Sequence, residues 1–123
     1  MARVKSKDTE PEMTVRRLLH GLGYRYRLHR ADLPGRPDLT FPSRRKVVFV
    51  NGCFWHGHLG CPRVRIPEAN RDYWVSKLDR NRVRDERNVA LLEQSGWGVM
   101  AVWECQLRDL TAVSERLITF LGR

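Results

Sequence analysis

The stretch Lys46-Val47-Val48-Phe49-Val50, followed directly by Asn51-Gly52-Cys53-Phe54-Trp55-His56-Gly57-His58, decides the expected fold. The first five residues are mostly β-branched or aromatic, which is typical of a central, buried strand. From residue 51 to residue 69 the chain is rich in Gly, Cys, His and Pro, which predicts an irregular segment. We therefore expect a buried strand at 46–50 that leads into a loop of chemically active side chains.

One helix and two strands are expected before this strand. Thr9-Glu10-Pro11-Glu12 predicts a helix start, with Thr9 as the cap and Glu12 as its capping-box partner. Gly21 or Gly23 is expected to end that helix. Residues 24–29 alternate between apolar and polar side chains, which predicts a half-buried strand. A segment rich in turn residues then leads to a short strand at 38–41.

A helix, a strand and a second helix are expected after the loop. The long helix covers about residues 70–94, the strand 98–103, and the last helix about 111–121. The order helix, three strands, helix, strand, helix predicts one α/β domain with a mixed central sheet flanked by helices. A chain of 123 residues suits a single core. Residues 1–7 are expected to form a flexible basic arm.

The charge of the chain indicates the class of its partner. The formal net charge is +9, which favours binding to a polyanion, most often a nucleic acid. Binding to ribosomes or to acidic lipid is the alternative on charge alone. No stretch approaches the roughly 18 apolar residues of a membrane span, and the start MARVKSKDTEPEM lacks the apolar core of a secretory signal. A cytoplasmic location without membrane contact is therefore expected.

All three cysteines of the chain fall into one potential ligand set. Cys53, His58 and Cys61 lie in the irregular segment, and Cys105 follows the strand at 98–103. Three thiols and one imidazole form a common tetrahedral zinc set. No ligand position is left open, so the expected Zn²⁺ is structural and orders a loop that has few apolar residues. The alternative is that Cys53 and Cys105 are small buried hydrophobic residues.

Three carboxylates are candidates for chemistry. Asp38 begins a strand, Glu12 lies in the first helical turn, and Asp85 lies inside the long helix. Asp85 shares an apolar helix face with other residues, so it needs a partner, and either His56 or an arginine could supply it. The residues on that face are Trp74, Leu78, Asp85, Val89 and Leu92. Carboxylates near strand ends in a basic α/β domain suit Mg²⁺ and phosphodiester hydrolysis.

Six segments stand out together, namely Ser6-Lys7-Asp8-Thr9 with Glu12, Leu33-Pro34-Gly35-Arg36-Pro37-Asp38, Gly52-Cys53-Phe54-Trp55-His56, Asn81 with Asp85, Gly96-Trp97 and Val102-Trp103-Glu104-Cys105. In these segments and their order the chain resembles the very-short-patch repair (Vsr) endonucleases, bacterial mismatch nickases with a PD-(D/E)XK-like, restriction-endonuclease-like fold. The second and third segments are the most specific. The resemblance covers about residues 6–110.

The resemblance implies a Mg²⁺-dependent endonuclease that nicks one strand of double-stranded DNA at a T·G mismatch. Asp38 would bind Mg²⁺ together with the backbone carbonyl of Val50. Glu12 would help hold metal-bound water. His56 would be the catalytic acid or base, with Asp85 in support. Cys53, His58, Cys61 and Cys105 match the structural zinc ligands of the family, with one extra residue between His58 and Cys61.

The resemblance also implies how DNA is bound. Phe54, Trp55 and Trp74 match an aromatic wedge that enters DNA beside the mismatch, although Trp74 could instead pack in the core. Arg36 and Lys7 are expected DNA contacts. The family further implies a monomer that acts at the bacterial nucleoid and a functional link to a cytosine methyltransferase and other repair proteins.

One residue departs from the family pattern. Asn51 stands where the family usually carries Asp or His, and a neutral amide cannot accept a proton as a base. Two alternative hypotheses follow from this departure. The chain could be a binding-only module for mismatched or modified DNA, or a nuclease of the same fold with a different mismatch, deaminated base or restriction-linked target.

Overall fold

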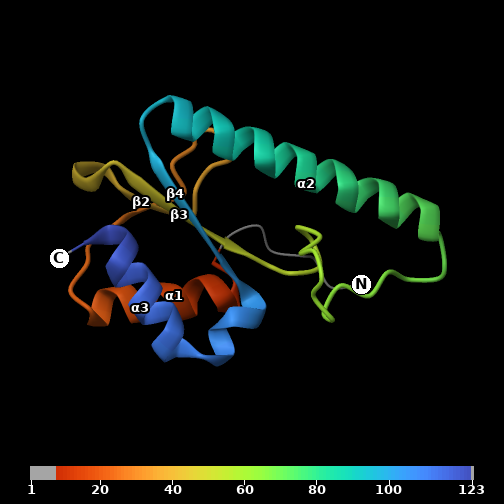
Figure 1. The fold of residues 1–123 in the computed structure, drawn as a ribbon, viewed down its shortest axis with the longest axis horizontal. Coiled ribbons are helices and arrows are strands. Elements are labelled where there is room, and N and C mark those ends of the chain that lie inside the picture. The colour runs from red at the N-terminus through yellow and green to blue at the C-terminus, as the bar shows by residue number, and fades with distance from the viewer. Residues whose placement is uncertain (1–7, 123) are drawn as a thin grey trace.

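The computed structural model describes residues 8–122, and the expected basic arm at 1–7 lies outside this range. The elements, drawn in Figure 1, are α1 (Glu10–Gly21), β1 (Arg27–Leu28), β2 (Leu39–Phe41), β3 (Lys46–Asn51), α2 (Arg71–Gln94), β4 (Gly98–Trp103) and α3 (Leu110–Leu121), with 3-10 helices at Pro42–Arg44 and Glu104–Arg108. This order confirms the predicted single α/β domain.

The four strands form one mixed sheet in the order β1-β2-β3-β4. The pairs β1–β2 and β2–β3 are antiparallel, whereas β3 and β4 are parallel, with Asn51 opposite Trp103 at their carboxyl ends. The parallel pair requires a crossover, and α2 supplies it. The predicted mixed sheet is therefore confirmed, and the loop after β3 and the segment after β4 leave the sheet at the same edge.

Helices cover both faces of the sheet (Figure 1). On one face α1 and α3 enclose the main apolar core, made of Val15, Leu19, Tyr24, Leu39, Phe41, Val48, Val50, Met100, Val102, Val113, Leu117 and Leu121. On the other face lies a smaller cluster of Val47, Leu92 and Trp97. Alternate residues of β3 thus face opposite layers, as the pleat of a strand requires.

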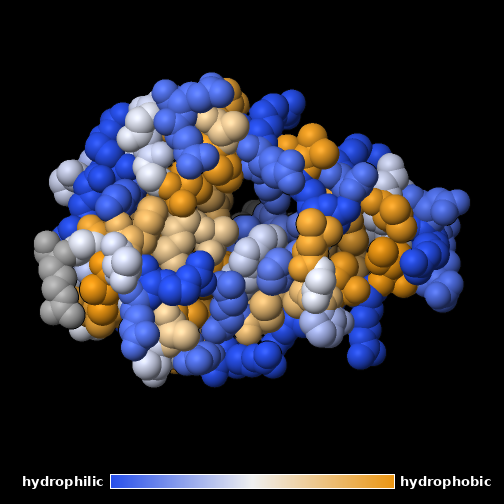
Figure 2. Space-filling model, in the orientation of Figure 1, coloured by the Kyte–Doolittle hydropathy of each residue, from blue (hydrophilic) through white to orange (hydrophobic). Residues whose placement is uncertain are grey.

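The helix α2 packs on the sheet only near its C-terminal end. Leu92 is fully buried in the smaller cluster, while the N-terminal half of α2 projects past the sheet beside the loop of residues 52–69 (Figure 1). The expected inner face of α2 is confirmed, since Leu78 is buried and Trp74, Asp85 and Val89 are half-buried. Figure 2 shows a hollow beneath α2 near the middle of the molecule.

The start of α1 differs in one detail from the expected capping box. Thr9 is the cap, and its Oγ1 accepts a hydrogen bond from the Glu12 backbone N–H at 3.3 Å. The Glu12 carboxylate does not bond back to the Thr9 N–H. Its Oε1 accepts from the backbone N–H of Asp8 at 3.1 Å, one residue earlier. The reciprocal bond is therefore shifted, because Glu12 is drawn toward partners on other elements.

The main difference from the expected elements is the strand at 24–29. Only Arg27–Leu28 pairs with the sheet, as β1. Tyr24 and Tyr26 instead place their rings edge-on against Phe41, with ring centroids 6.4 and 6.2 Å away. The alternating pattern therefore reflected tyrosine packing more than strand pairing. Among residues 8–122, no helix is both long and apolar enough to cross a membrane.

Candidate active site and metal-ligand cluster

Asp38 lies just before β2 and connects two strands through its side chain. Its Oδ2 accepts a hydrogen bond of 2.7 Å from the backbone N–H of Val50. Burial, with a smaller contribution from the nearby Glu12 carboxylate, raises the pKa of Asp38 to about 6. The Val50 N–H and His29 oppose this rise in the pKa. A carboxylate held in such a place is costly to ionise without a cation beside it.

Glu12 reaches the same region from α1 and is almost completely buried, with 1% of its surface exposed. Its Oε2 accepts a hydrogen bond from Arg16 Nη2 at 2.6 Å and lies 2.8 Å from His29 Nε2. Arg16 also pairs with Asp8 at 2.6 Å. The buried carboxylate is thus fully engaged by donors, as burial of a charge requires.

His56 and Asp85 form the expected pair. His56 Nδ1 lies 2.6 Å from Asp85 Oδ2, and both side chains are about one-third exposed. The arginine alternative is present as a weaker contact, since Arg84 Nη2 lies 3.9 Å from Asp85 Oδ1. The geometry leaves His56 Nε2 free of the Asp85 contact. A carboxylate that binds one ring nitrogen orients the other, as in catalytic and metal-binding histidines.

Two hollows meet at these residues. A groove of about 710 Å³ contains Glu12, Asp38, Val50 and His56, together with side chains from α2 and the loop. A cavity of about 220 Å³ contains Asp38, Val50 and His56 again, now with His29, Gly35, Arg36, Phe49 and Asn51. The predicted residues Asp38, Glu12, His56, Val50 and Asn51 are therefore brought together, and Arg36 lies exposed at the rim.

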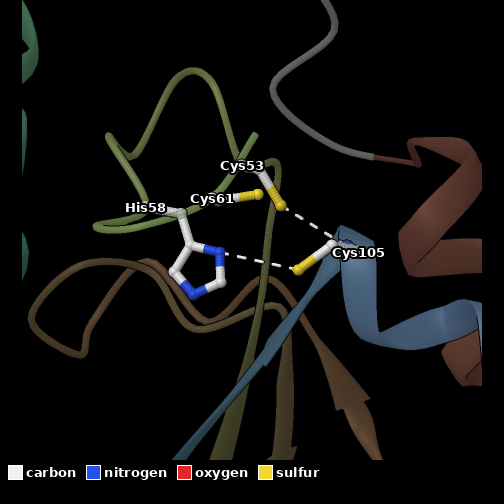
Figure 3. A group of neighbouring side chains, drawn as sticks. All are labelled: Cys53, His58, Cys61 and Cys105. Carbon is white, nitrogen blue, oxygen red and sulfur yellow. Dashed lines mark hydrogen bonds between the residues drawn. The ribbon is translucent and has the colours of Figure 1, made fainter. Parts of the chain in front are cut away.

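The predicted ligand set Cys53, His58, Cys61 and Cys105 also converges (Figure 3). One ligand atom from each residue lies within 4.8 Å of all the others. Cys105 Sγ is 3.6 Å from His58 Nδ1, and the Cys105 backbone N–H donates to Cys53 Sγ at 3.4 Å. Ligands of tetrahedral zinc are separated by about 3.5–4 Å, given metal–ligand bonds of about 2.0–2.3 Å. The donor set and its spacing fit a structural zinc site.

The thiols of this cluster differ in their pKa values, and their convergence is the evidence for a metal site. Burial raises the pKa of the Cys53 thiol to about 12, so its thiolate is strongly disfavoured in the absence of a positive charge. The backbone N–H of Arg63 lowers the pKa of Cys61. Because all four ligand atoms point at one centre (Figure 3), the alternative of isolated buried hydrophobic cysteines is disfavoured.

The three predicted wedge residues form one aromatic cluster. The ring of Phe54 lies edge-on to Trp55 and Trp74, with centroids 5.1 and 5.6 Å apart, and Trp55 and Trp74 are 5.9 Å apart. Trp55 is 36% exposed, and its backbone carbonyl accepts from Asn81 Nδ2 at 2.8 Å. Trp74 packs against the loop aromatics, so it neither joins the main core nor stands free.

Three residues near these sites were given no role in the site by the sequence, although Trp103 belongs to one of the segments that carry the resemblance. His29 contacts Glu12, and the polar alternation at 24–29 gave no signal that it would turn inward. The ring of Trp103 stacks on that of His58, with centroids 3.9 Å apart and planes at 6°, and lies edge-on to that of His56 at 6.3 Å, so it connects the Cys3His cluster to the pair of His56 and Asp85. Tyr73, half-exposed, extends the aromatic cluster beside Trp74. The predicted DNA contact Lys7 lies outside the described residues.

The chain is basic and has a mixed sheet, and its carboxylates and imidazoles cluster beside an open groove. These features are typical of an α/β nuclease. Comparison with known proteins narrows this class. Residues 1–62 match the family model of the DNA mismatch endonuclease Vsr. The chain belongs to the Vsr DNA mismatch endonuclease family and is a DNA nicking endonuclease, which confirms the resemblance.

Three relatives illustrate the similarity. The chain is 55% identical over 121 residues to the Type II nicking enzyme V.XorIIP of Xanthomonas oryzae pv. oryzae, covering 98% of this chain and 88% of that protein. It is 41% identical over 117 residues to the Type II nicking enzyme V.NmeAIP of Neisseria meningitidis, covering 95% and 83%. It is 37% identical over 119 residues to the DNA mismatch endonuclease Vsr of Escherichia coli, covering 97% and 76%.

Proposed function

We propose that this chain nicks one strand of double-stranded DNA at a T·G mismatch in a Mg²⁺-dependent reaction. The observation that carries the proposal is one continuous groove that contains Asp38, Glu12 and His56 together with Phe54 and Trp55. The chemistry would thus lie directly beside a surface that can stack on bases. The relative from Escherichia coli is named a mismatch endonuclease, and other relatives are named Type II nicking enzymes.

Asp38 and the Val50 carbonyl would hold Mg²⁺, and Glu12 would position water beside it. Oxygen ligands with room for water and phosphate are what Mg²⁺ prefers. The pKa of Asp38, raised by burial to about 6, supports a cation at this place, because a nearby positive charge would favour the carboxylate. Bound Mg²⁺ would supply a positive charge that acidifies water and stabilises the leaving oxygen.

His56 would move a proton during cleavage. Asp85 occupies Nδ1, so Nε2 is the ring nitrogen that can exchange a proton with a group in the groove. Asn51 lines the cavity beside Asp38 and His56, where its neutral amide could orient water or phosphate but could not act as a base. The proton transfer therefore falls to His56.

The aromatic cluster would read the mismatch. Phe54, Trp55 and Trp74 would enter the duplex, since stacking of a base on an aromatic ring contributes roughly 1–3 kcal/mol and a mismatched step is easier to open. Zn²⁺ at the Cys3His cluster would hold the loop that carries Phe54 and Trp55. Arg36 and Lys7 would contact the phosphate backbone.

We also propose the setting in which the protein acts. It would work as a monomer in the bacterial cytoplasm at the nucleoid, with a functional link to a cytosine methyltransferase and other repair proteins. A nickase cuts one strand, so a single active site on one chain suffices. The three relatives are bacterial proteins, which supports this setting.

The test is a nicking assay on a fluorescent duplex with one T·G pair and a matched T·A control. Nicking should require Mg²⁺, be abolished by chelation, and vanish in Asp38→Ala while that variant still binds the duplex. Robust cleavage by Asp38→Ala would remove Asp38 from its proposed role. A panel of all mismatches and deaminated bases separates T·G repair from a nuclease of the same fold with another target.

Asn51 keeps a second candidate open, a binding-only mismatch module. Its position in the cavity with Asp38 and His56 is the observation that favours this candidate. The comparison is between the parent protein and Asn51→Asp or Asn51→His. If none of the three nicks any mismatched duplex while all three bind, the binding-only function replaces the proposed one.

A further inference from the structure

We propose that His29 is a positioning residue that holds the Glu12 carboxylate in its working orientation beside Asp38. This inference rests on the proposed Mg²⁺-dependent nicking reaction and deepens it. His29 Nε2 lies 2.8 Å from Glu12 Oε2, although the two residues are 17 positions apart and come from different elements. The side chain of His29 is only 16% exposed and that of Glu12 only 2%, so the contact is shielded from water.

The Glu12 carboxylate is held from three directions. The backbone N–H of Asp8 donates to Oε1 at 3.1 Å. Arg16 Nη2 donates to Oε2 at 2.6 Å, and His29 contacts the same oxygen. The first two donors are local, since Asp8 directly precedes the Thr9 cap of α1 and Arg16 lies one helical turn after Glu12. His29 is the donor that ties the carboxylate to the sheet side of the site. Its loss would leave the carboxylate oriented only by donors within four residues of Glu12 in the chain.

The backbone places His29 for this role. β1 ends at Leu28, and His29 adopts a left-handed conformation with φ of 48°. A histidine with positive φ is uncommon, and such strain persists where surrounding contacts determine it. The His29 backbone N–H also donates to the Asp38 carbonyl at 3.2 Å. One residue thus contacts both Asp38, through its backbone, and Glu12, through its side chain.

A cation-ligand role for His29 is disfavoured by its neighbours. Asp8, Glu12 and His29 have ligand atoms within 4.8 Å of one another, which is close enough for a metal site. The guanidinium of Arg16, however, already bridges Asp8 and Glu12 at 2.6 Å each. A fixed positive charge therefore occupies the position that a metal ion would need, and repels a second cation.

The position of His29 also predicts that its loss affects the rate of nicking and not the binding of DNA. Glu12 lines the groove that is proposed to receive DNA, whereas His29 lines the smaller cavity that shares Asp38, Val50 and His56 with this groove. His29 itself is not among the residues that line the groove. Its removal should lower kcat and leave the KM for the duplex nearly unchanged.

The test compares His29→Gln with His29→Asn, two amides of different reach. The Gln side-chain nitrogen can take the place of Nε2 and donate to Glu12, while the shorter Asn cannot. We expect His29→Asn to lower kcat about 10- to 100-fold, the usual effect of losing an orienting partner. His29→Gln should stay within about threefold of the parent. The exposed His20, changed to Asn, is the matched control and should nick normally.

Thermal unfolding supplies a control for folding. His29→Asn removes a donor from the buried Glu12 carboxylate, so this variant should be less stable than His29→Gln. Nicking is therefore compared at a temperature at which both variants are fully folded, where a merely structural role predicts equal kcat and positioning predicts a lower kcat in His29→Asn. Duplex binding in EDTA should be unchanged in both variants.

Mn²⁺ binding to the protein–DNA complex, followed by the electron paramagnetic resonance of free Mn²⁺, supplies a readout that does not depend on activity. Positioning predicts a Mn²⁺ affinity close to that of the parent in both variants, because Glu12, the residue that His29 orients, is proposed to hold metal-bound water and not the metal itself. Normal kcat in His29→Asn, equal loss in both variants, or lowered Mn²⁺ affinity in both would each overturn the proposal. Absence of nicking by the parent would instead count against the proposed function.

Discussion

At the scale of single residues, the burial of Asp38 opposes the ionised carboxylate that its proposed role as a metal ligand requires. Its carboxylate lies between a backbone donor from β3 and the Glu12 carboxylate, and its pKa is raised to about 6. In the unfolded chain an Asp has a pKa of about 4. Without a cation, the folded protein therefore binds a proton between these values that the unfolded chain has already released.

This shift predicts that Asp38→Asn stabilises the metal-free protein at pH 7.5. The proton retained by Asp38 stabilises the folded state. This contribution is fully present below about pH 4 and is lost as the pH rises through about 6, so the parent carries the cost of a buried charge above about pH 6. The gain should be about 1–3 kcal/mol, since one pKa unit corresponds to about 1.4 kcal/mol. Urea unfolding in EDTA at pH 7.5 and pH 3.5 measures it. A gain that is equal at both pH values would contradict the assignment.

A second prediction at this scale concerns the pair of His56 and Asp85. Asp85→Asn should lower kcat about 10- to 100-fold, because the amide no longer provides the charge that orients and stabilises the imidazole. Glu93→Gln, an exposed change near the end of the same helix, is the control and should have no effect. Single-turnover nicking measures both variants, and parent-like rates in Asp85→Asn would exclude a supporting role.

At the scale of elements, the loop of residues 52–69 and the projecting half of α2 depend on each other. The loop places Phe54 and Trp55 against Trp74, and Asn81 of α2 bonds to the loop backbone. Neither segment packs on the main core of the sheet. The order of both is therefore expected to depend on the Cys3His cluster at the base of the loop.

Removal of zinc should disorder the loop of residues 52–69 and leave the sheet intact. Cys61→Ser should bind less Zn²⁺ than the parent, for which we expect about one ion per chain. Nicking should be lost and loop amides should exchange rapidly, while the far-ultraviolet circular dichroism of the sheet and α1 persists. Elemental analysis and hydrogen exchange provide the measurements. A parent protein purified without zinc would contradict the structural assignment.

The aromatic cluster makes a separate prediction at the same scale. Trp55→Ala should weaken binding to a T·G duplex by about 1–3 kcal/mol, the contribution of stacking one base. Its melting temperature should fall only slightly, since the ring packs on Phe54 and Trp74 and not in the main core. Leu59→Ala, more exposed on the same loop, serves as the control. Fluorescence anisotropy measures binding of the duplex. If Trp55→Ala and Leu59→Ala weakened this binding equally, Trp55 would not be a DNA contact.

At the scale of the whole molecule, the groove lies where α1, the strand ends of the sheet and α2 meet. Thr9 and Glu12 come from α1, Val50 from β3, and Lys77, Asn81 and Arg84 from α2. The cations on α2 thus face the carboxylates across the groove. This arrangement suits a phosphate backbone that passes between the cations of α2 and the proposed Mg²⁺ site.

The net charge of +9 predicts a strong salt dependence of DNA binding. The logarithm of the binding constant should fall linearly with that of the salt concentration, by about 0.9 per phosphate contact. Because phosphate contacts carry no base information, matched and T·G duplexes should give nearly the same slope. Titrations between low and physiological salt measure it. A slope near zero would exclude binding through the phosphates.

Most of the helices and strands and the metal-ligand set could be predicted from the sequence, whereas the strand expected at 24–29 was reduced to Arg27–Leu28. Buried strands such as 46–50 and the amphipathic α2 are visible because their side-chain periodicity is local. The ligand types Cys53, His58, Cys61 and Cys105 were recognisable because thiols and imidazoles are scarce and chemically distinctive. The pairing of Asp85 remained open between His56 and an arginine, because spacing along a helix does not show what lies across a loop.

The way in which the site is assembled became visible only in the fold. His29 belonged to a stretch that alternates like an outward strand, yet its left-handed backbone turns its ring toward Glu12. Trp103 stacks on His58 because parallel pairing of β3 and β4 ends both strands at one edge. These contacts join residues far apart in the chain, and their energies depend on burial and direction. Local sequence encodes neither, so the chemical residues could be found from the sequence while their mutual orientation required the fold.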